Sequence, residues 1–213
     1  MTPNEASTAA ERICTLAPVV PVLVVKNIDH AAPLAQSLVA GGLPALEVTL
    51  RTPVALEVIA EMAKIPGGQV GAGTLLTPQD VENAKKAGAT FGVSPGATDR
   101  LLDACEANDL PLLPGATSAS ESMRLLERGY SVQKFFPAEA AGGAPFLKSL
   151  SSPLPQIRFC PTGGVSLTNA TDYLGLPNVL CVGGSWVAPG GLVEAGDWDG
   201  IRKLAAEAAS LPR

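Results

Sequence analysis

Short apolar runs alternate with longer segments of helical pattern along most of the chain. The apolar runs are rich in valine, leucine and glycine, and they predict strands that begin near Val19, Ala45, Gln69, Phe91, Pro111, Ser131, Ile157 and Val179. The segments between them predict helices, among them His30–Ala40, Pro53–Lys64, Pro78–Ala87, Asp99–Asn108 and Ala119–Arg128. Glycine follows several of these helices, as is typical of helix C-termini.

Strands that alternate with helices predict parallel βαβ units. Eight such units predict a TIM (β/α)8 barrel, and 213 residues lie near the lower end of the size range of that fold. A doubly wound open sheet is the structural alternative, although it usually has fewer strands. No linker or low-complexity stretch divides the chain. We therefore expect residues 1–213 to form one barrel domain, with a helix at residues 5–16 outside the repeat.

Composition narrows the classes of partner. The formal net charge of −5 and the isoelectric point near 4.9 argue against nucleic acid or an anionic membrane as a partner. The longest apolar run, Leu16 to Val25, contains two prolines and is too short to span a bilayer. The N-terminal residues lack the basic and apolar regions of a signal peptide.

The cysteines are expected to be ordinary reduced thiols of a cytoplasmic protein. Cys14, Cys105, Cys160 and Cys181 lie far apart and show no C-x-x-C spacing, and His30 is the only histidine. A zinc site of the Cys/His type is therefore not expected. No carboxylate cluster stands at the predicted strand ends, so we expect no metal and no cofactor.

A lysine stands inside the sixth predicted strand, among largely apolar residues. The stretch from Val132 to Glu139 reads as a buried strand that stops at Pro137, and Lys134 lies just before the strand ends. Burial disfavours the charged ammonium, and a neutral amine can attack a carbonyl to form a Schiff base. The alternative is an edge lysine whose stem lies along the strand while its ammonium reaches water.

The second predicted strand carries polar side chains on one face. Glu47, Thr49 and Arg51 share a face because side chains alternate along a strand, and the opposite face is apolar. Since the apolar face must meet the helices, the polar face is predicted to point into the barrel, with Glu47 opposite Lys134. In this fold the active site lies at the C-terminal ends of the strands. An ion pair between Glu47 and Arg51 that only seals the barrel is the alternative interpretation.

Hydroxyls and glycines mark the ends of further predicted strands. Thr74 ends the third strand and Thr162 the seventh, where a hydroxyl can bind a carboxylate or a substrate hydroxyl. Each threonine is also compatible with an ordinary loop or cap. Glycine pairs follow the seventh and eighth strands at residues 163–164 and 183–184, where this fold commonly binds phosphate through backbone amides. Tight turns without a ligand are the alternative.

Five of these segments resemble the motifs of the 2-keto-3-deoxy-6-phosphogluconate (KDPG) aldolases, which are also described as acting on 4-hydroxy-2-oxoglutarate. The motifs are Leu46–Thr52, Val70–Thr74, Lys134–Glu139, Phe159–Gly164 and Gly183–Trp186. They occur in the order of that family, and the resemblance extends from about Val19 to Ala209.

The resemblance implies a class I lyase that splits KDPG into pyruvate and glyceraldehyde 3-phosphate in the Entner–Doudoroff pathway. It also implies activity on 4-hydroxy-2-oxoglutarate, and a cytoplasmic homotrimer of TIM barrels. By this likeness Lys134 forms the Schiff base and Glu47 is the acid/base. The residues that the likeness assigns to the substrate are Arg51 and Thr74 for the carboxylate, Thr162 for binding and stereochemistry, and Gly163, Gly164, Gly184 and Ser185 for the phosphate.

Three other functions fit parts of the same pattern. An aldolase for the 6-phosphogalactonate epimer would use the same residues. A non-catalytic phosphometabolite-binding barrel would use Lys134 only as a cation, and would form no covalent adduct with pyruvate. A phosphate-binding epimerase or isomerase would not need a lysine in an apolar strand.

Overall fold

The computed structural model describes residues 1–213, with strands and helices in alternation. The strands are β1 (Val19–Leu23), β2 (Ala45–Thr49), β3 (Gln69–Gly73), β4 (Phe91–Val93), β5 (Leu112–Leu113), β6 (Gly115–Ala116), β7 (Val132–Phe135), β8 (Arg158–Pro161) and β9 (Val182–Gly184). The helices are α1 (Pro3–Thr15), η1 (Ile28–His30), α2 (Ala31–Ala40), α3 (Ala55–Met62), α4 (Pro78–Lys86), α5 (Asp99–Ala107), α6 (Ala119–Arg128), α7 (Gly143–Leu150), α8 (Ala170–Leu174), α9 (Gly190–Ala195) and α10 (Trp198–Ala209). None of the helices has the length and hydropathy that a membrane span needs.

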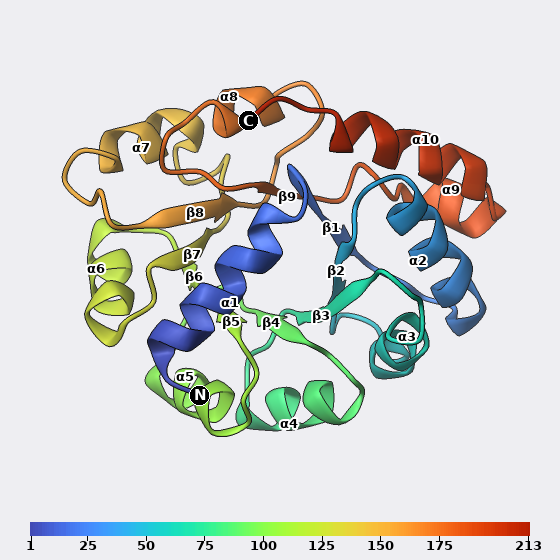
Figure 1. The fold of residues 1–213 in the computed structure, drawn as a ribbon, viewed down its shortest axis with the longest axis horizontal. Coiled ribbons are helices and arrows are strands. Elements are labelled where there is room, and N and C mark those ends of the chain that lie inside the picture. The colour runs from blue at the N-terminus through green and yellow to red at the C-terminus, as the bar shows by residue number, and fades with distance from the viewer.

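The strands form a closed parallel barrel, as predicted. Parallel pairing runs from β9 through β1, β2, β3 and β4 to β5, and from β6 through β7 to β8. Bridges between residues 159 and 179 and between 162 and 183 join β8 to β9 and complete the ring. In Figure 1 the helices α2 to α10 surround the strands, while α1 lies across the middle of the view. The fold is thus a TIM barrel with an additional N-terminal helix.

The fifth barrel strand is divided into β5 and β6 by Pro114. Proline has no amide hydrogen, so it cannot donate to the ladder and interrupts the strand. Its carbonyl still accepts a hydrogen bond from the Lys134 amide at 2.8 Å. The two pieces therefore hold the places of one strand between β4 and β7.

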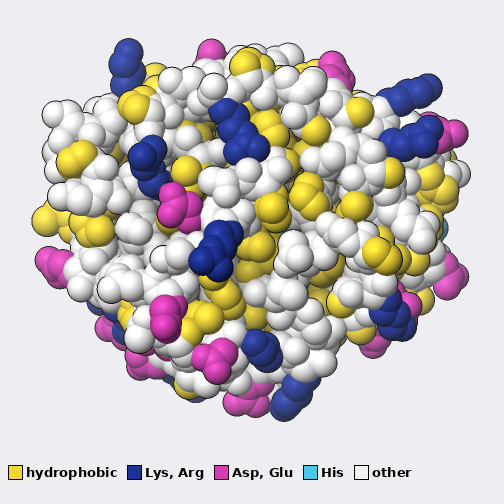
Figure 2. Space-filling model, viewed as in Figure 1, with side chains coloured by type: hydrophobic (Ala, Val, Ile, Leu, Met, Phe, Trp, Pro, Cys, Tyr) yellow, Lys and Arg dark blue, Asp and Glu magenta, His cyan; other side chains and the backbone are white.

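Helix α1 closes the N-terminal end of the barrel. Its N-terminus is capped by Thr2 and Glu5, with Pro3 in the first turn. The Ser7 hydroxyl oxygen accepts hydrogen bonds at 2.9 Å from the backbone amides of Ser131 and Val132, at the start of β7. Since this end is covered, the C-terminal ends of the strands form the open end. Figure 2 shows the face on which α1 lies, where charged side chains of both signs are scattered among hydrophobic ones.

Two apolar clusters fill the molecule. The larger cluster packs helices against the outside of the barrel. The smaller one contains a side chain from most of the barrel strands together with two from α1, and therefore fills the barrel interior. Glycines make room there for large neighbours, because a Cβ on Gly71 would lie 2.4 Å from the Phe91 ring.

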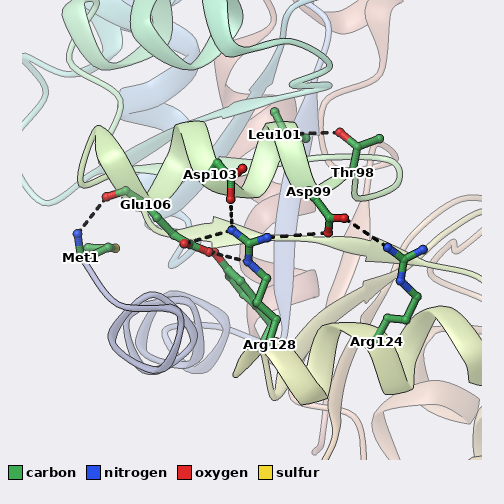
Figure 3. Close-up of polar contacts among 9 residues, drawn as sticks. Met1, Thr98, Asp99, Leu101, Asp103, Glu106, Arg124 and Arg128 are labelled. Carbon is green, nitrogen blue, oxygen red and sulfur yellow. Dashed lines mark hydrogen bonds and ion pairs between the residues drawn. The ribbon is translucent and has the colours of Figure 1, made fainter.

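Arg128 joins α5 to α6 on the outside of the barrel. Its guanidinium lies between the carboxylates of Asp99, Asp103 and Glu106, as Figure 3 shows. The two bonds to Glu106 measure 2.9 and 3.1 Å, in a bidentate arrangement. The Tyr130 hydroxyl donates to the same Glu106 carboxylate at 3.1 Å. This network fixes the start of β7 relative to the preceding helices.

Most predicted boundaries, those of α3 included, are correct to within a few residues, and the two-residue difference at the start of α3 has a physical reason. The prediction placed this helix over residues 53–64. Thr52 and Pro53 precede it in the sequence as Thr77 and Pro78 stand at the start of α4. Thr77 caps α4 together with Asp80. The Thr52 hydroxyl instead donates to the Val25 carbonyl at 2.7 Å. It is therefore not a cap, and α3 begins only at Ala55.

Candidate active site

Lys134 lies inside the barrel near the C-terminal end of β7. The residue is 5% exposed, and its strand neighbours are Gly115 on one side and Cys160 on the other. The Lys134 Nζ atom lies 3.3 Å from Glu47 Oε1 and 5.3 Å from the centre of the Phe136 ring. The inward orientation of Lys134 that strand alternation predicted is confirmed. The alternative, an edge lysine whose ammonium reaches water, is wrong.

Glu47 faces Lys134 from β2. It is 3% exposed, and a Cβ on Gly73 of the neighbouring strand would lie only 2.3 Å from its Oε1 atom. The missing side chain of Gly73 is thus what leaves space for the carboxylate. Burial raises the pKa of Glu47, whereas the charges of Lys134 and Arg51 oppose that rise. A carboxyl group with a raised pKa is well suited to both accept and donate a proton near neutral pH.

Arg51 and Thr74 lie at the open ends of β2 and β3. The Arg51 side chain is exposed and forms no ion pair within the protein, so its charge remains available to an anion. Its field nevertheless reaches Glu47, whose pKa it lowers. Thr74 has a φ of 65°, which is unusual for a β-branched residue and typical of functional sites.

Thr162 lies at the end of β8 and is buried. A Cβ on Gly183 would lie 2.2 Å from its Oγ1 atom, so the hydroxyl occupies the space above that glycine, inside the barrel. The nearest backbone acceptor, the Cys160 carbonyl, is 3.5 Å away. This long contact leaves the hydroxyl able to bond to a ligand beside Lys134.

The glycines predicted to surround a phosphate are glycines for different structural reasons. Gly163 and Gly164 have φ angles of 99° and 79°, which other residues rarely adopt. A Cβ on Gly184 would lie 1.7 Å from the Trp186 ring, so internal packing alone already requires a glycine there. Ser185 is exposed, and it lines a cavity of about 390 Å³ together with Lys26 and other residues.

The loop after β7 is held against the loop after β8, a contact that spacing did not reveal. The Ala138 and Glu139 amides donate to the carbonyls of Thr162 and Gly163 at 2.8 and 3.0 Å. The Tyr173 hydroxyl donates to the Glu139 carboxylate. Glu139 is therefore a structural residue.

The barrel thus brings Lys134, Glu47 and Thr162 together in its interior. Arg51 and Thr74 lie at the rim beside β2 and β3, and the glycine loops lie across β1 from them. A buried amine beside a carboxyl group suits Schiff-base chemistry on a carbonyl compound. The exposed cation and the backbone amides at the rim suit the anionic ends of such a compound.

Comparisons with known proteins agree with this geometry. A family model described as KDPG and KHG aldolase matches residues 10–204. The KHG/KDPG aldolase of Escherichia coli K12 is 52% identical over 202 residues, covering 94% of this chain and 95% of that protein.

Two solved structures are similar over nearly their whole length. The KDPG aldolase of Zymomonas mobilis ZM4 with 3-phosphoglycerate is 49% identical with a TM-score of 0.92, over 97% of this chain and 98% of that one. The KDPG aldolase of Legionella pneumophila, with pyruvate captured at low pH as a covalent carbinolamine, is 46% identical with a TM-score of 0.91. That match covers 94% of this chain and 98% of the other. The chain belongs to the KDPG and KHG aldolase family.

Proposed function

We propose that this enzyme is a class I aldolase that cleaves KDPG into pyruvate and glyceraldehyde 3-phosphate, and that it also acts on 4-hydroxy-2-oxoglutarate. The observation that carries the proposal is the buried pair of Lys134 Nζ and Glu47 Oε1, 3.3 Å apart at the open end of the barrel. The name of the E. coli relative supports both substrates. The reaction belongs to the Entner–Doudoroff pathway.

The first half of the reaction forms the Schiff base. The Nζ atom of Lys134 attacks the C2 ketone of the substrate, and the carbinolamine loses water to give an iminium ion. Glu47 donates the proton that the departing hydroxyl needs, because its raised pKa keeps a proton available. Arg51 holds the substrate carboxylate through charge-assisted hydrogen bonds, which fixes the carbonyl beside the amine.

The second half breaks the carbon–carbon bond. Glu47, as the carboxylate, takes the proton from the C4 hydroxyl while the C3–C4 bond breaks and the electron pair moves into the iminium as an enamine. Glyceraldehyde 3-phosphate leaves, the enamine is protonated at C3, and water releases pyruvate and free Lys134. In this scheme Thr74 assists Arg51 at the carboxylate, and Thr162 orients the substrate beside the amine. Gly163, Gly164, Gly184 and Ser185 surround the phosphate.

We further infer that residues 1–213 form one barrel domain that assembles as a homotrimer in the cytoplasm. Family likeness supports the trimer, and so do the large apolar side chains of Val24, Ile28 and Leu76. These remain 46%, 38% and 59% exposed in the isolated chain and follow the ends of β1 and β3. Light scattering should give three times the 21.7 kDa chain mass. A monomer at working concentrations would contradict the assembly without affecting the chemistry.

Trapping with pyruvate and borohydride tests the activity. Reduction should leave a three-carbon adduct on the peptide that contains Lys134, and Lys134→Arg should abolish both adduct and turnover because a guanidinium is not a nucleophile here. Lys148→Arg is the matched control, since Lys148 is exposed on α7. An adduct on Lys148, or none at all, would overturn the Schiff-base assignment and favour a binding barrel.

A further inference from the structure

Three of the four cysteines meet inside the barrel, although the sequence separates them widely. Cys14 comes from α1, Cys160 from β8, and Cys181 from the residue before β9. Their Sγ atoms all lie within 4.8 Å of one another, each side chain is fully buried, and none is in a disulfide. The fourth cysteine, Cys105, lies on α5 in the outer cluster.

The spacing of the sulfurs matches the ligands of one soft metal ion. Zinc–sulfur bonds measure about 2.3 Å, so thiolates that share a tetrahedral ion lie about 3.8 Å apart. Separations of at most 4.8 Å therefore need only small side-chain movements to reach that geometry. Thiolate ligands select soft ions, and hard ions such as Mg²⁺ and Ca²⁺ prefer oxygen.

A fourth ligand position is available on one side of the sulfurs. A small cavity lies beside Cys14 and Cys160, and its lining extends from Ile13 and Pro111 at the α1 end to Glu47 near the active site. Its volume of about 10 Å³ is room for one water molecule, which would complete the coordination shell.

Charge balance also favours a divalent ion at this place. Three thiols that lose three protons and bind one divalent ion carry a net charge of −1. Lys134 is the direct strand neighbour of Cys160, and its ammonium lies on the side of the barrel where this charge would develop.

We propose that Cys14, Cys160 and Cys181 form a binding site for one soft divalent ion of the zinc group, between the catalytic lysine and helix α1. Zinc is the ion of this class that cells supply, and Cd²⁺ is the spectroscopic probe. The aldolase scheme above uses none of the three sulfurs. The site also differs from the zinc sites that cysteine spacing predicts, since closure of the barrel creates it.

Titration of the full-length protein with Cd²⁺ tests the proposal. Ultraviolet thiolate-to-metal absorption should saturate at one ion per chain, with release of protons in weakly buffered solution. Cys14→Ala and Cys181→Ala should each weaken binding at least tenfold. Cys105→Ala is the matched control and should bind as the wild type does. Binding that survives both cluster variants, or that disappears in Cys105→Ala, would overturn the proposal.

X-ray absorption of the zinc-loaded wild-type protein decides the question even if a variant does not fold. The proposal expects three sulfur neighbours at about 2.3 Å and one lighter atom. Because Cys105 lies apart from the other cysteines, a three-sulfur shell can arise only from this cluster. A shell of nitrogen and oxygen ligands, or no retained zinc after gel filtration, would refute the site.

Discussion

Gly73→Ala should disable the enzyme through a single methyl group that touches no substrate. An alanine Cβ at this position would lie 2.3 Å from Oε1, 2.6 Å from Cγ and 2.9 Å from Cδ of Glu47. Gly73 has an ordinary strand conformation and keeps its backbone pairing with β2, so only the side chain creates conflict. The Glu47 carboxyl must therefore move, because the neighbouring backbone is fixed in the barrel ladder.

The size of the effect follows from the distances. Carbon atoms pack at about 3.5–4.0 Å, so the Glu47 side chain has to withdraw by about 1 Å. A misplacement of about 1 Å in a catalytic group typically costs about 100-fold in rate. The free energy of unfolding should fall by about 1–3 kcal/mol from overpacking, which leaves the barrel folded. We therefore expect kcat to fall about 100-fold in a protein that melts only a few degrees lower.

Steady-state release of pyruvate from KDPG measures kcat, and circular dichroism measures the melting temperature. Gly191→Ala is the matched control, because a Cβ there meets nothing within 4 Å and the residue lies in α9. The control should keep the wild-type kcat. Lys134 remains in place in Gly73→Ala, so pyruvate should still be trapped, only more slowly. A folded Gly73→Ala enzyme with the kcat of the control would refute the role of the Glu47 position.

Three further outcomes are expected. Burial raises the pKa of Glu47, so its base form is lost as pH falls through a value above the ordinary ~4.3. The fall of kcat on the acidic side of the pH profile should therefore begin above pH ~4.3. Glu47→Gln should lose about 10²–10⁴-fold in kcat, and this acidic fall should disappear with it. Ser185→Ala should raise KM for KDPG about 10–100-fold, which is the effect of losing one hydrogen bond to a charged group. An equal rise in KM for 4-hydroxy-2-oxoglutarate, which has no phosphate, would show that the loop shapes the barrel and does not bind phosphate. Arg128→Ala should lower the free energy of unfolding, measured by urea titration, by about 1–3 kcal/mol and leave kcat unchanged. The reason is that its ion pair is largely buried, with the Arg128 side chain 23% exposed and the Glu106 side chain 20% exposed. An unchanged urea midpoint would mean that the network contributes nothing to stability.

Much of the barrel is predictable because its strands are short apolar runs between clear breaks. The inward direction of Lys134 and Glu47 also follows from alternation along single strands, which is a local property. The start of α3 was not predictable, because Thr52 bonds to the Val25 carbonyl, a partner that is distant along the chain. Local patterns report local geometry, and they do not report which competing partner a side chain finds.

Contacts between strands form the part of the site that spacing does not reveal. The glycine pair at 183–184 predicted phosphate binding, yet Gly184 is also required by the Trp186 ring. Gly73 is needed beside Glu47, and three distant cysteines converge below Lys134. Each of these contacts depends on how far neighbouring strands are staggered when the barrel closes, and a single sequence carries no direct signal of that stagger.

The reactivity of the site depends on the closed end of the barrel as well as the open one. The rise in the Glu47 pKa comes first from burial, and the side chains below Glu47 belong to the interior cluster that α1 completes with Ala10 and Cys14. Helix α1 therefore does more than cover the barrel, because it excludes bulk water from beneath the carboxyl group and the lysine. Low local polarity strengthens every charge interaction above it, including that between Lys134 and Glu47. The N-terminal helix, which carries no recognisable motif, is in this way part of what makes the two catalytic side chains reactive.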